Sequence, residues 1–493
     1  MMSLISTRTA STASPFEAVL CGLAPDGGLY VPASLPAWTL DQIQALAGLP
    51  YEQAAARVLH GFFDAVPMEE MQNLTKQAYA SFTDEKRVPV SEIEPGLYAM
   101  ELYHGPTLAF KDVALQLLPL LMAYSAKAVG KKEKSLVLVA TSGDTGKAAL
   151  EGFADKADTA IVVCYPNDGV SPAQRLQMVT QKGDNVCVTA VEGNFDDCQN
   201  GVKRLMGDRA FHKMVEENGY TITSANSINF GRLVPQIVYY FTSYAELLRR
   251  GEIQLGELLD FVVPTGNFGD ILAGWYAKKM GLPVGKLICA SNKNNVLSRF
   301  FETGTYDCSG ELYKTTSPSM DILISSNLER LLFELTEKDP EPIRTWMEQR
   351  AAQKRFTVEE NLMEKAREDS MRPGRMTKRP AAPSAMCLQR IMCYWIRTAL
   401  WGIVHINNTK KSKTAIIKPC CCVRPARTNL LPRYCPLWAI RQMGRNRPPK
   451  PWRRLPANRC RRPFWICLRQ SKSISHCVAP EELDNLVKEF LQK

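Results

Sequence analysis

The sequence predicts an α/β fold built on open, mostly parallel sheets with flanking helices. Short apolar runs at 136–140, 160–164, 186–191 and 261–263 each end in a loop, and most lead into a helical pattern. This alternation is typical of parallel strands joined by crossover helices. Because ligands of such sheets bind beyond the carboxyl ends of the strands, we expect the site in the loops that follow these runs.

Length and composition indicate a globular protein of two or three domains. The chain has 493 residues, of which 45% are hydrophobic, and this is too long for one ordinary domain. Residues 1–20 contain no apolar core of signal-peptide length, and no later run reaches the roughly 18 apolar residues of a membrane span. We therefore expect a cytoplasmic protein without a membrane partner. Its 15 cysteines lack zinc-like spacing, so we expect reduced thiols and no metal site.

The first 95 residues are predicted to form an N-terminal domain. Residues 15–32, PFEAVLCGLAPDGGLYVP, predict a short amphipathic helix, a glycine-rich turn and a short strand. Apolar residues then follow helical spacing from Leu40 to about Ser81. No catalytic constellation is visible here, so packing accounts for this part.

The stretch on which the functional argument depends is 103–112, YHGPTLAFKD. Its lysine, Lys111, follows the apolar triplet LAF and precedes an apolar run over 113–121. An amine acts as a nucleophile when apolar surroundings or a nearby cation lower its pKa. The placement suits a Schiff-base lysine that holds an aldehyde cofactor, with a surface lysine at a helix start as the alternative. His104 is either an acid–base group or a structural histidine.

Two loops and one polar cluster are candidate anion sites. The loop TSGDTG at 141–146 follows the first apolar run, and PTGNFGD at 264–270 follows the last. Small residues let a ligand approach the backbone, and N–H groups at a helix N-terminus attract an anion. The cluster NSINFGR at 226–232 either holds a second anion or caps a helix. Purely structural turns remain the alternative for both loops.

Taken together, these motifs resemble those of threonine synthases. HGPTLAFKD, ATSGDTGKAA, SINFGR and PTGNFGD occur in this order, and the N-terminal STR with PFEAVLCGLAPDGGLYVP fits the same family over roughly residues 4–370. The resemblance implies two subdomains that bind pyridoxal 5'-phosphate in a fold type II enzyme, tryptophan synthase beta-like. It also implies a lyase reaction, the conversion of O-phospho-L-homoserine and water into L-threonine and phosphate, as the last step of threonine biosynthesis. A related lyase acting on serine or threonine, without a second phosphate site, is the alternative.

The resemblance further implies roles for individual residues. Lys111 would hold the cofactor and carry protons during the reaction. The other residues expected at the cofactor are Ser142, Gly143, Asp144, Thr145, Gly266, Asn267, Phe268, Gly269 and Asp270. The residues expected to bind the substrate phosphate are Thr107, Ser227, Asn229 and Arg232. The oligomeric state, monomer or homodimer, stays open.

The resemblance ends at Asp369, where the composition changes. Between Asp369 and Glu481 the sequence contains 24 Lys and Arg and no acidic residue, whereas the whole chain has 61 basic and 50 acidic residues. The rest of the chain is therefore net acidic, although the total charge is +11. A catalytically inactive fold with a basic nucleic-acid-binding extension is one interpretation. Translation out of frame is the other, and with it we expect no nucleic-acid partner.

Our hypothesis for this segment is a pair of compensating changes of reading frame. The sequence can be translated back into codons and read in a frame that takes the third base of one codon and the first two of the next. In this frame the residues from Cys393 to Gly402 allow LLDPHSAVG, and residues 425–430 allow SPYKF. Both short sequences resemble segments of threonine synthases. The predicted organisation is an N-terminal domain at 1–95, a catalytic core at 96–370, an irregular segment at 371–477 and a tail at 478–493 resumed in frame. Since the segment replaces the hydroxyl residue that faces the pyridine nitrogen in the family, we expect poor folding beyond Asp369 and little activity.

Overall fold

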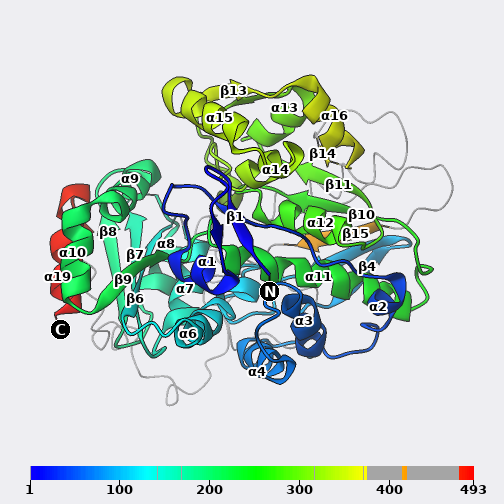
Figure 1. The fold of residues 1–493 in the computed structure, drawn as a ribbon, viewed down its shortest axis with the longest axis horizontal. Helices are drawn as coiled ribbons and strands as arrows, with labels where there is room; N and C mark the ends of the chain where they lie inside the picture. The colour runs from blue at the N-terminus through cyan, green and yellow to red at the C-terminus, as the bar shows by residue number, and fades with distance from the viewer. Residues whose placement is uncertain are drawn as a thin grey trace, which may run out of the picture.

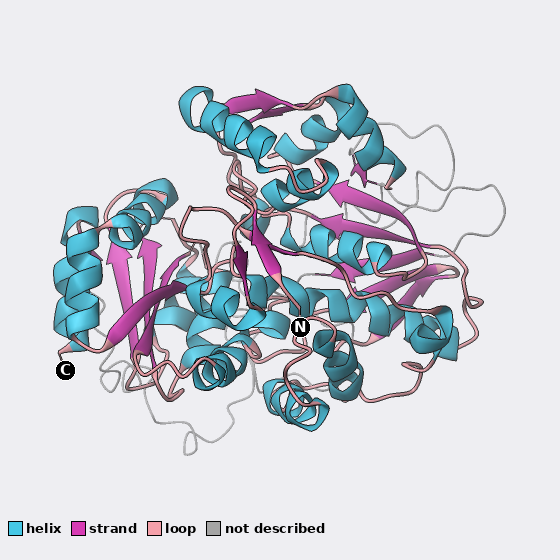
Figure 2. Cartoon of the chain, in the orientation of Figure 1, coloured by secondary structure: helices cyan, strands magenta, loops and turns pink. Residues whose placement is uncertain are grey.

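The computed structural model describes residues 2–141, 143–167, 169–315, 317–369, 371–374, 414–418 and 477–492. Two sheets, each accompanied by helices, lie on either side of the N-terminal strands in this view (Figure 1). Parallel strands joined by helices follow one another from residue 134 to residue 290, and helices lie beside the strands of both large sheets (Figure 2). The predicted α/β fold with mostly parallel sheets is confirmed.

The N-terminal residues form a small antiparallel sheet of order β2-β1-β3 and four helices. Helix α1 begins with a capping box, in which Ser14 accepts from the Glu17 N–H and the Glu17 carboxylate accepts from the Ser14 N–H. The elements are β1 (Leu4–Ser6), β2 (Thr12–Ala13), α1 (Pro15–Cys21), β3 (Tyr30–Pro32), α2 (Leu40–Gln44), α3 (Tyr51–His60) and α4 (Met68–Ala78).

The first large sheet is parallel throughout, with strand order β16-β8-β7-β6-β9. Every residue of β7 and β8 is buried, as expected for continuous apolar strands covered on both faces. Its strands are β6 (Lys134–Ala140), β7 (Thr159–Pro166), β8 (Val186–Val191), β9 (Tyr220–Ser224) and β16 (Cys477–Val478). The helices in this part are α5 (Asp112–Leu115), α6 (Leu118–Ala128), α7 (Asp144–Phe153), α8 (Pro172–Val179), α9 (Phe195–Gly207) and α10 (Arg209–Glu217). The strands predicted at 136–140, 160–164 and 186–191 are confirmed.

The second large sheet has the order β14-β11-β10-β15-β5-β4 and is parallel except for the β4–β5 pair. The strand predicted at 261–263 lies within β10. Its strands are β4 (Val90–Glu94), β5 (Leu97–Glu101), β10 (Leu259–Pro264), β11 (Val284–Ala290), β14 (Met371–Gly374) and β15 (Thr414–Lys418). Helices α11 (Phe230–Arg249) and α12 (Gly269–Lys279) pack against each other, and α11 is buried along most of its length.

A group of shorter elements follows β11 and lies at the top of Figure 1. Strands β12 and β13 pair antiparallel beside aromatic side chains that include Phe300, Tyr306 and Phe356. The elements are α13 (Val296–Thr303), β12 (Thr305–Asp307), η1 (Pro318–Met320), α14 (Leu328–Leu335), α15 (Pro340–Gln353), β13 (Arg355–Thr357) and α16 (Glu360–Glu368).

The basic segment departs from the prediction of irregular structure at two places. β14 pairs with β11, and β15 lies between β10 and β5, because backbone hydrogen bonds to a parallel neighbour require no particular side-chain period. Residues 375–413 and 419–476 lie outside the described part of the chain, and so do the stretches on which the frame hypothesis rests. The tail continues with η3 (Pro480–Glu482) and α19 (Leu483–Leu491), whose Leu483 and Val487 are buried against α9 and α10. None of the described helices has the length and apolar character needed to cross a bilayer.

Candidate active site

The lysine loop at 103–112 is folded around the carboxyl group of Asp112. The backbone N–H and the hydroxyl of Thr107 donate to it at 2.8 and 2.6 Å. A Cβ at Gly105 would lie 2.4 Å from the Asp112 Cβ, so only glycine fits there. Burial raises the pKa of Asp112 to about 6, although these hydrogen bonds act in the opposite direction. The loop thereby holds Lys111 at the start of α5.

The amine of Lys111 is enclosed. Its Nζ lies 3.7 Å from Asp144 Oδ2, and the side chain is 12% exposed. The same nitrogen lies 5.5 Å from the centroid of the Phe110 ring. This enclosure excludes the alternative of a surface lysine. An amine between an aromatic ring and one carboxylate can react with an aldehyde held next to it.

The loop at 141–146 is organised by Thr141. Its Oγ1 accepts from the N–H groups of Gly143 and Gly146 at 3.0 and 2.9 Å. Gly143 has a φ of 143°, and a Cβ there would lie 2.4 Å from the side chain of Gln174. A residue with a side chain at this position would be strained and would displace Gln174. The glycine is therefore required both for the backbone turn and for the approach of Gln174.

Asp144 begins α7 and is held from two sides. Gln174 Nε2 donates to Oδ1 at 2.7 Å, and the hydroxyl of Ser319 donates to Oδ2, the oxygen nearest Lys111. Thr145 is partly buried on the same helical turn. Ser142, the remaining candidate of this loop, lies outside the described residues. Asp144 therefore presents a fixed carboxylate to the lysine.

Two carbonyl groups of the 264–270 turn accept hydrogen bonds from residues that follow η1. Ser325 Oγ donates to the carbonyl of Gly266 at 2.6 Å. Asn327 donates to the carbonyl of Asn267 twice, through its backbone N–H at 3.1 Å and its Nδ2 at 2.9 Å. In a trans peptide the carbonyl and the next N–H point in opposite directions. The N–H groups of the turn are therefore directed away from Ser325 and Asn327.

These N–H groups form a candidate anion site. Phe268 takes a left-handed φ of 66° as the cap of α12, with its buried ring packed on Phe301. Within the described residues no acceptor is found for the backbone N–H groups of Gly266, Asn267, Phe268 and Gly269. Successive free N–H groups at a helix N-terminus favour a phosphate. No cationic side chain is needed for this interaction.

Asp270 fastens the start of α12 to α11. Its Oδ1 accepts from the hydroxyls of Tyr239 and Tyr240 at 2.6 and 3.0 Å, and Oδ2 is buried without a partner in the described part of the chain. Burial raises the pKa of Asp270 to about 6, against the opposing effect of the two hydroxyls. An ionised carboxylate at this position would repel an anion bound to the turn. The geometry therefore gives Asp270 an anchoring contact rather than a contact with phosphate.

Asn229 is the N-cap of α11. Its Oδ1 accepts from the Gly231 N–H at 2.8 Å, and its Nδ2 donates to the carbonyls of Val19 and Ser224, both at 3.0 Å. The helix-cap interpretation of the 226–232 cluster is confirmed for this residue. The polar atoms of its side chain are used in these contacts. Asn229 therefore fixes the start of α11 and has no donor left for a ligand.

Arg232 is a buried cation in the same cluster. It is 4% exposed, and its Nη1 donates to the carbonyl of Ala225 at 2.6 Å. Its Nε is buried without a partner, and no carboxylate of the described residues forms an ion pair with it. Burial lowers the pKa of Arg232 to about 10. Because an uncompensated buried charge is costly, this guanidinium fits an anionic ligand. Ser227, partly buried nearby in sequence, is the other candidate donor.

These parts border one region of the molecule. Asp144 contacts both Lys111 and Ser319, and the Ser319 carbonyl lies 3.2 Å from the position of a Cβ on Gly266. The loops after β6 and β9 adjoin, because these strands pair in the first sheet. Helix α11 carries Arg232 near its start and packs against α12, which follows the 264–270 turn. An enclosed amine, a set of free N–H groups and an unpaired guanidinium therefore fit a ligand with an aldehyde and a phosphate beside a second anion.

Several contacts in this region were missed by reasoning from sequence. Ser319 and Gln174 orient Asp144 from distant parts of the chain, and no local signal marks them. Tyr239 and Tyr240 lie two helical turns after Arg232, so helical spacing along α11 was a usable signal. His104 Nε2 lies 2.8 Å from Glu101 Oε2, which favours its structural interpretation.

Comparison with known proteins places these observations in a family. Residues 3–79 match the family described as threonine synthase N terminus, and residues 86–355 match that of pyridoxal-phosphate dependent enzymes. Threonine synthase of Pseudomonas aeruginosa is 42% identical over 371 residues, which are 74% of this chain and 76% of that protein. The crystal structure of pyridoxal-phosphate-bound threonine synthase from Brucella melitensis superimposes with a TM-score of 0.77 at 34% identity, covering 100% of both chains. Yeast threonine synthase gives a TM-score of 0.68 at 36% identity over 75% of each chain.

The residues present fit pyridoxal phosphate, since Lys111 supplies an amine for the aldehyde and the 264–270 turn supplies N–H groups for the phosphate. The family matches cover the residues that carry both features. The chain therefore belongs to the threonine synthase family of pyridoxal-phosphate-dependent enzymes.

Proposed function

We propose that this chain is a lyase that converts O-phospho-L-homoserine and water into L-threonine and inorganic phosphate. The observation that carries the proposal is the grouping of three features in one region: an enclosed lysine, the N–H groups of 266–269, and a separate guanidinium. Neither the N–H groups nor the Arg232 Nε has an acceptor among the described residues. The substrate brings a carboxylate and a phosphate, and the cofactor brings another phosphate. Distinct anion sites are therefore needed, and distinct donors exist.

Lys111 is proposed to bind the cofactor covalently and to move protons at Nζ once the substrate has displaced it. What a bound pyridoxal phosphate supplies is an electron sink, which makes carbon-bound protons of the substrate acidic. Asp144, 3.7 Å from Nζ, stabilises the amine when it carries a proton. Gln174 and Ser319 keep this carboxylate in place. Gly143 and Thr145 are proposed to lie beside the cofactor.

The cofactor phosphate is proposed to bind the N–H groups of Gly266, Asn267, Phe268 and Gly269. Asp270 supports this turn from behind through Tyr239 and Tyr240. The positive end of α12 adds to the attraction. A phosphate bound in this way needs no lysine or arginine.

Arg232 is proposed as the principal ligand of a substrate anion, with Ser227 as a second donor. The buried Nε, which has no partner in the part of the chain that the structure describes, supports this assignment. Thr107 and Asn229 are proposed to act indirectly, because the Thr107 hydroxyl is donated to Asp112 and the Asn229 amide caps α11. They hold the loops that carry Lys111 and Arg232.

The test is release of inorganic phosphate from O-phospho-L-homoserine by the purified full-length chain with pyridoxal phosphate. We expect phosphate and L-threonine in equal amounts. Formation of a keto acid from serine or threonine, without phosphate release from O-phospho-L-homoserine, would instead establish a dehydratase and refute the proposal.

A further inference from the structure

Arg330, near the start of α14, is fully buried and contacts two distant segments as well as the N-cap residue of its own helix. Its Nε donates to the carbonyl of Tyr30 at 2.8 Å, its Nη2 donates to the carbonyl of Ile228 at 2.6 Å, and its Nη1 donates to Asn327 Oδ1. No carboxylate of the described residues forms an ion pair with it. The side chain thus joins the N-terminal strand β3, the 226–232 cluster and Asn327 by hydrogen bonds in the fixed geometry of a guanidinium.

Asn327 connects Arg330 to the 264–270 turn by hydrogen bonds. Its Oδ1 accepts from Arg330, which has only donors, so its Nδ2 must face the carbonyl of Asn267, at 2.9 Å. Because that carbonyl is held, the N–H of Phe268 is held in the opposite direction. Through the Asn327 side chain, Arg330 therefore adds to the backbone N–H of Asn327 in fixing where one N–H group of the candidate phosphate site points.

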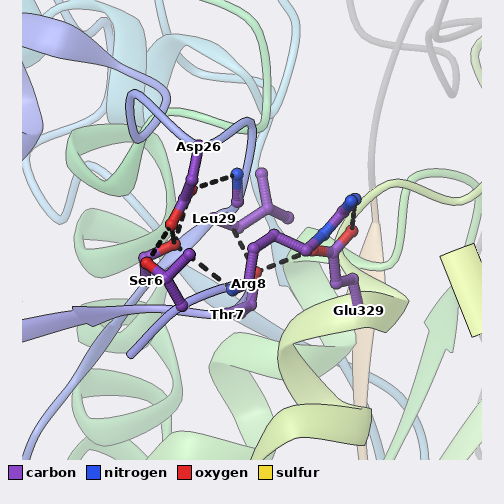
Figure 3. Close-up of polar contacts among 8 residues, drawn as sticks. Ser6, Thr7, Arg8, Asp26, Leu29 and Glu329 are labelled. Atoms are coloured by element: carbon purple, nitrogen blue, oxygen red, sulfur yellow. Dashed lines mark hydrogen bonds and ion pairs between the residues drawn. The ribbon is translucent and has the colours of Figure 1, made fainter. Parts of the chain in front are cut away.

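The position of α14 is itself set by the N-terminal strands. Glu329, beside Arg330, accepts from Arg8 Nε and Nη2 at 2.6 and 2.9 Å and from the hydroxyl of Thr7 at 2.7 Å (Figure 3). The Thr7 hydroxyl oxygen also accepts from the Leu29 N–H at 2.8 Å. A bidentate arginine–carboxylate pair fixes both distance and orientation. The start of α14 is therefore rigidly docked where it reaches the turn.

We infer that Arg330, acting through Asn327, is a positioning residue that holds the 264–270 turn ready to bind the cofactor phosphate. The inference rests on the proposed function, in which this turn receives that phosphate. Arg330 contacts no reacting atom in this assignment. Its effect on cofactor binding falls on the phosphate end and spares the aldehyde end, and this distinguishes it from a residue that merely supports the fold.

The experiment compares pyridoxal phosphate with pyridoxal, which has the same aldehyde but no phosphate. Arg330→Lys keeps the positive charge but loses the planar guanidinium with its several donors. Asn327→Ala removes the side-chain hydrogen bond to the Asn267 carbonyl and keeps the backbone one. Arg299→Lys is the matched control, since Arg299 is on the surface and its Nη2 lies 3.3 Å from Asp307. Cofactor-free full-length proteins are titrated with each aldehyde below their unfolding temperatures, with absorbance of the covalent adduct as the readout.

In both site variants, Kd for pyridoxal phosphate is expected to rise at least about tenfold, which corresponds to the loss of one hydrogen bond that involves a charged group. Kd for pyridoxal is expected to stay within about twofold of the wild type, and Arg299→Lys is expected to change neither. Inorganic phosphate should compete less well in the site variants.

An unchanged Kd for pyridoxal phosphate, or an equal loss of affinity for both aldehydes, would overturn the inference. If Arg330→Lys does not fold, Asn327→Ala decides the question by the same comparison. Failure of the proposed function is recognised separately, by the absence of phosphate release from O-phospho-L-homoserine. A wild type that binds pyridoxal phosphate no better than pyridoxal would contradict the phosphate site itself.

Discussion

Substitution of Asp270 by asparagine removes a buried carboxyl group with almost no change of shape. The amide oxygen of asparagine can still accept from Tyr239 and Tyr240, which donate to Asp270 Oδ1 at 2.6 and 3.0 Å. The amide nitrogen takes the place of Oδ2, a buried oxygen without a partner in the described residues. The variant therefore isolates the effect of the charge that Asp270 acquires as pH rises.

The sign and size of this effect follow from the pKa. Burial raises the pKa of Asp270 from 3.8 to about 6, so the folded protein binds this proton more tightly than the unfolded chain. The free energy of unfolding therefore decreases as pH rises from about 3.8 to about 6. The full decrease, reached above pH 6, is about 3 kcal/mol. About 1.4 kcal/mol of it falls between pH 5 and pH 8. Asp270→Asn should escape this loss.

The assay is equilibrium urea unfolding of the cofactor-free protein at pH 5 and pH 8. The stability of Asp270→Asn relative to the wild type should increase by about 1.4 kcal/mol between the two pH values. Asp41→Asn is the matched control, because Asp41 is an exposed carboxylate that also lies in the first turn of a helix. A relative stability of Asp270→Asn that does not change with pH, or that changes as much in the control, would refute the reasoning.

Three further substitutions test the site. Lys111→Ala should abolish both turnover and the covalent adduct; mass spectrometry after borohydride reduction should find labelled Lys111 in the wild type only, and labelling elsewhere would contradict the assignment. Arg232→Met should lower kcat/KM about 10-fold or more, the value of a hydrogen bond to a charged group, without lowering the stability of the cofactor-free protein. An unchanged kcat/KM would argue against a ligand role. Gly143→Ala should lower stability by about 1–3 kcal/mol, because φ is 143° and the new Cβ would lie 2.4 Å from Gln174. Thermal unfolding checks this, with Gly207→Ala as the control, since a Cβ at Gly207 meets nothing within 4 Å.

Much of the fold was predictable because the signals are local. The runs at 136–140, 160–164, 186–191 and 261–263 are continuous apolar stretches, and such stretches lie in parallel strands buried on both faces. The general rule that ligands bind beyond the carboxyl ends of such strands directed attention to the correct loops.

The environment of individual site residues was not predictable in this way. Thr107 carries a hydroxyl suited to a phosphate, yet it donates to Asp112, five positions away. Asp270 lies beside the turn, yet its carboxyl group faces two tyrosines of α11. The strand β15 was not predicted, and only its pairing with β5 and β10 in the folded chain identifies it. In each case the contact is set by a neighbour that the fold supplies, and the residue type alone does not predict it.

The sequence by itself determined the class of fold, the order of the motifs and the lysine around which they are arranged, since strand periodicity, glycine turns and motif spacing are all written within short stretches. Only the tertiary structure decided which polar groups remain available to ligands. Within the described residues the Arg232 Nε and the N–H groups of residues 266–269 have no acceptor, whereas the side chains of Asn229 and Thr107 are hydrogen-bonded. The physical reason is that a donor can bind a ligand only if no acceptor of the protein lies beside it, and these acceptors come from distant parts of the chain.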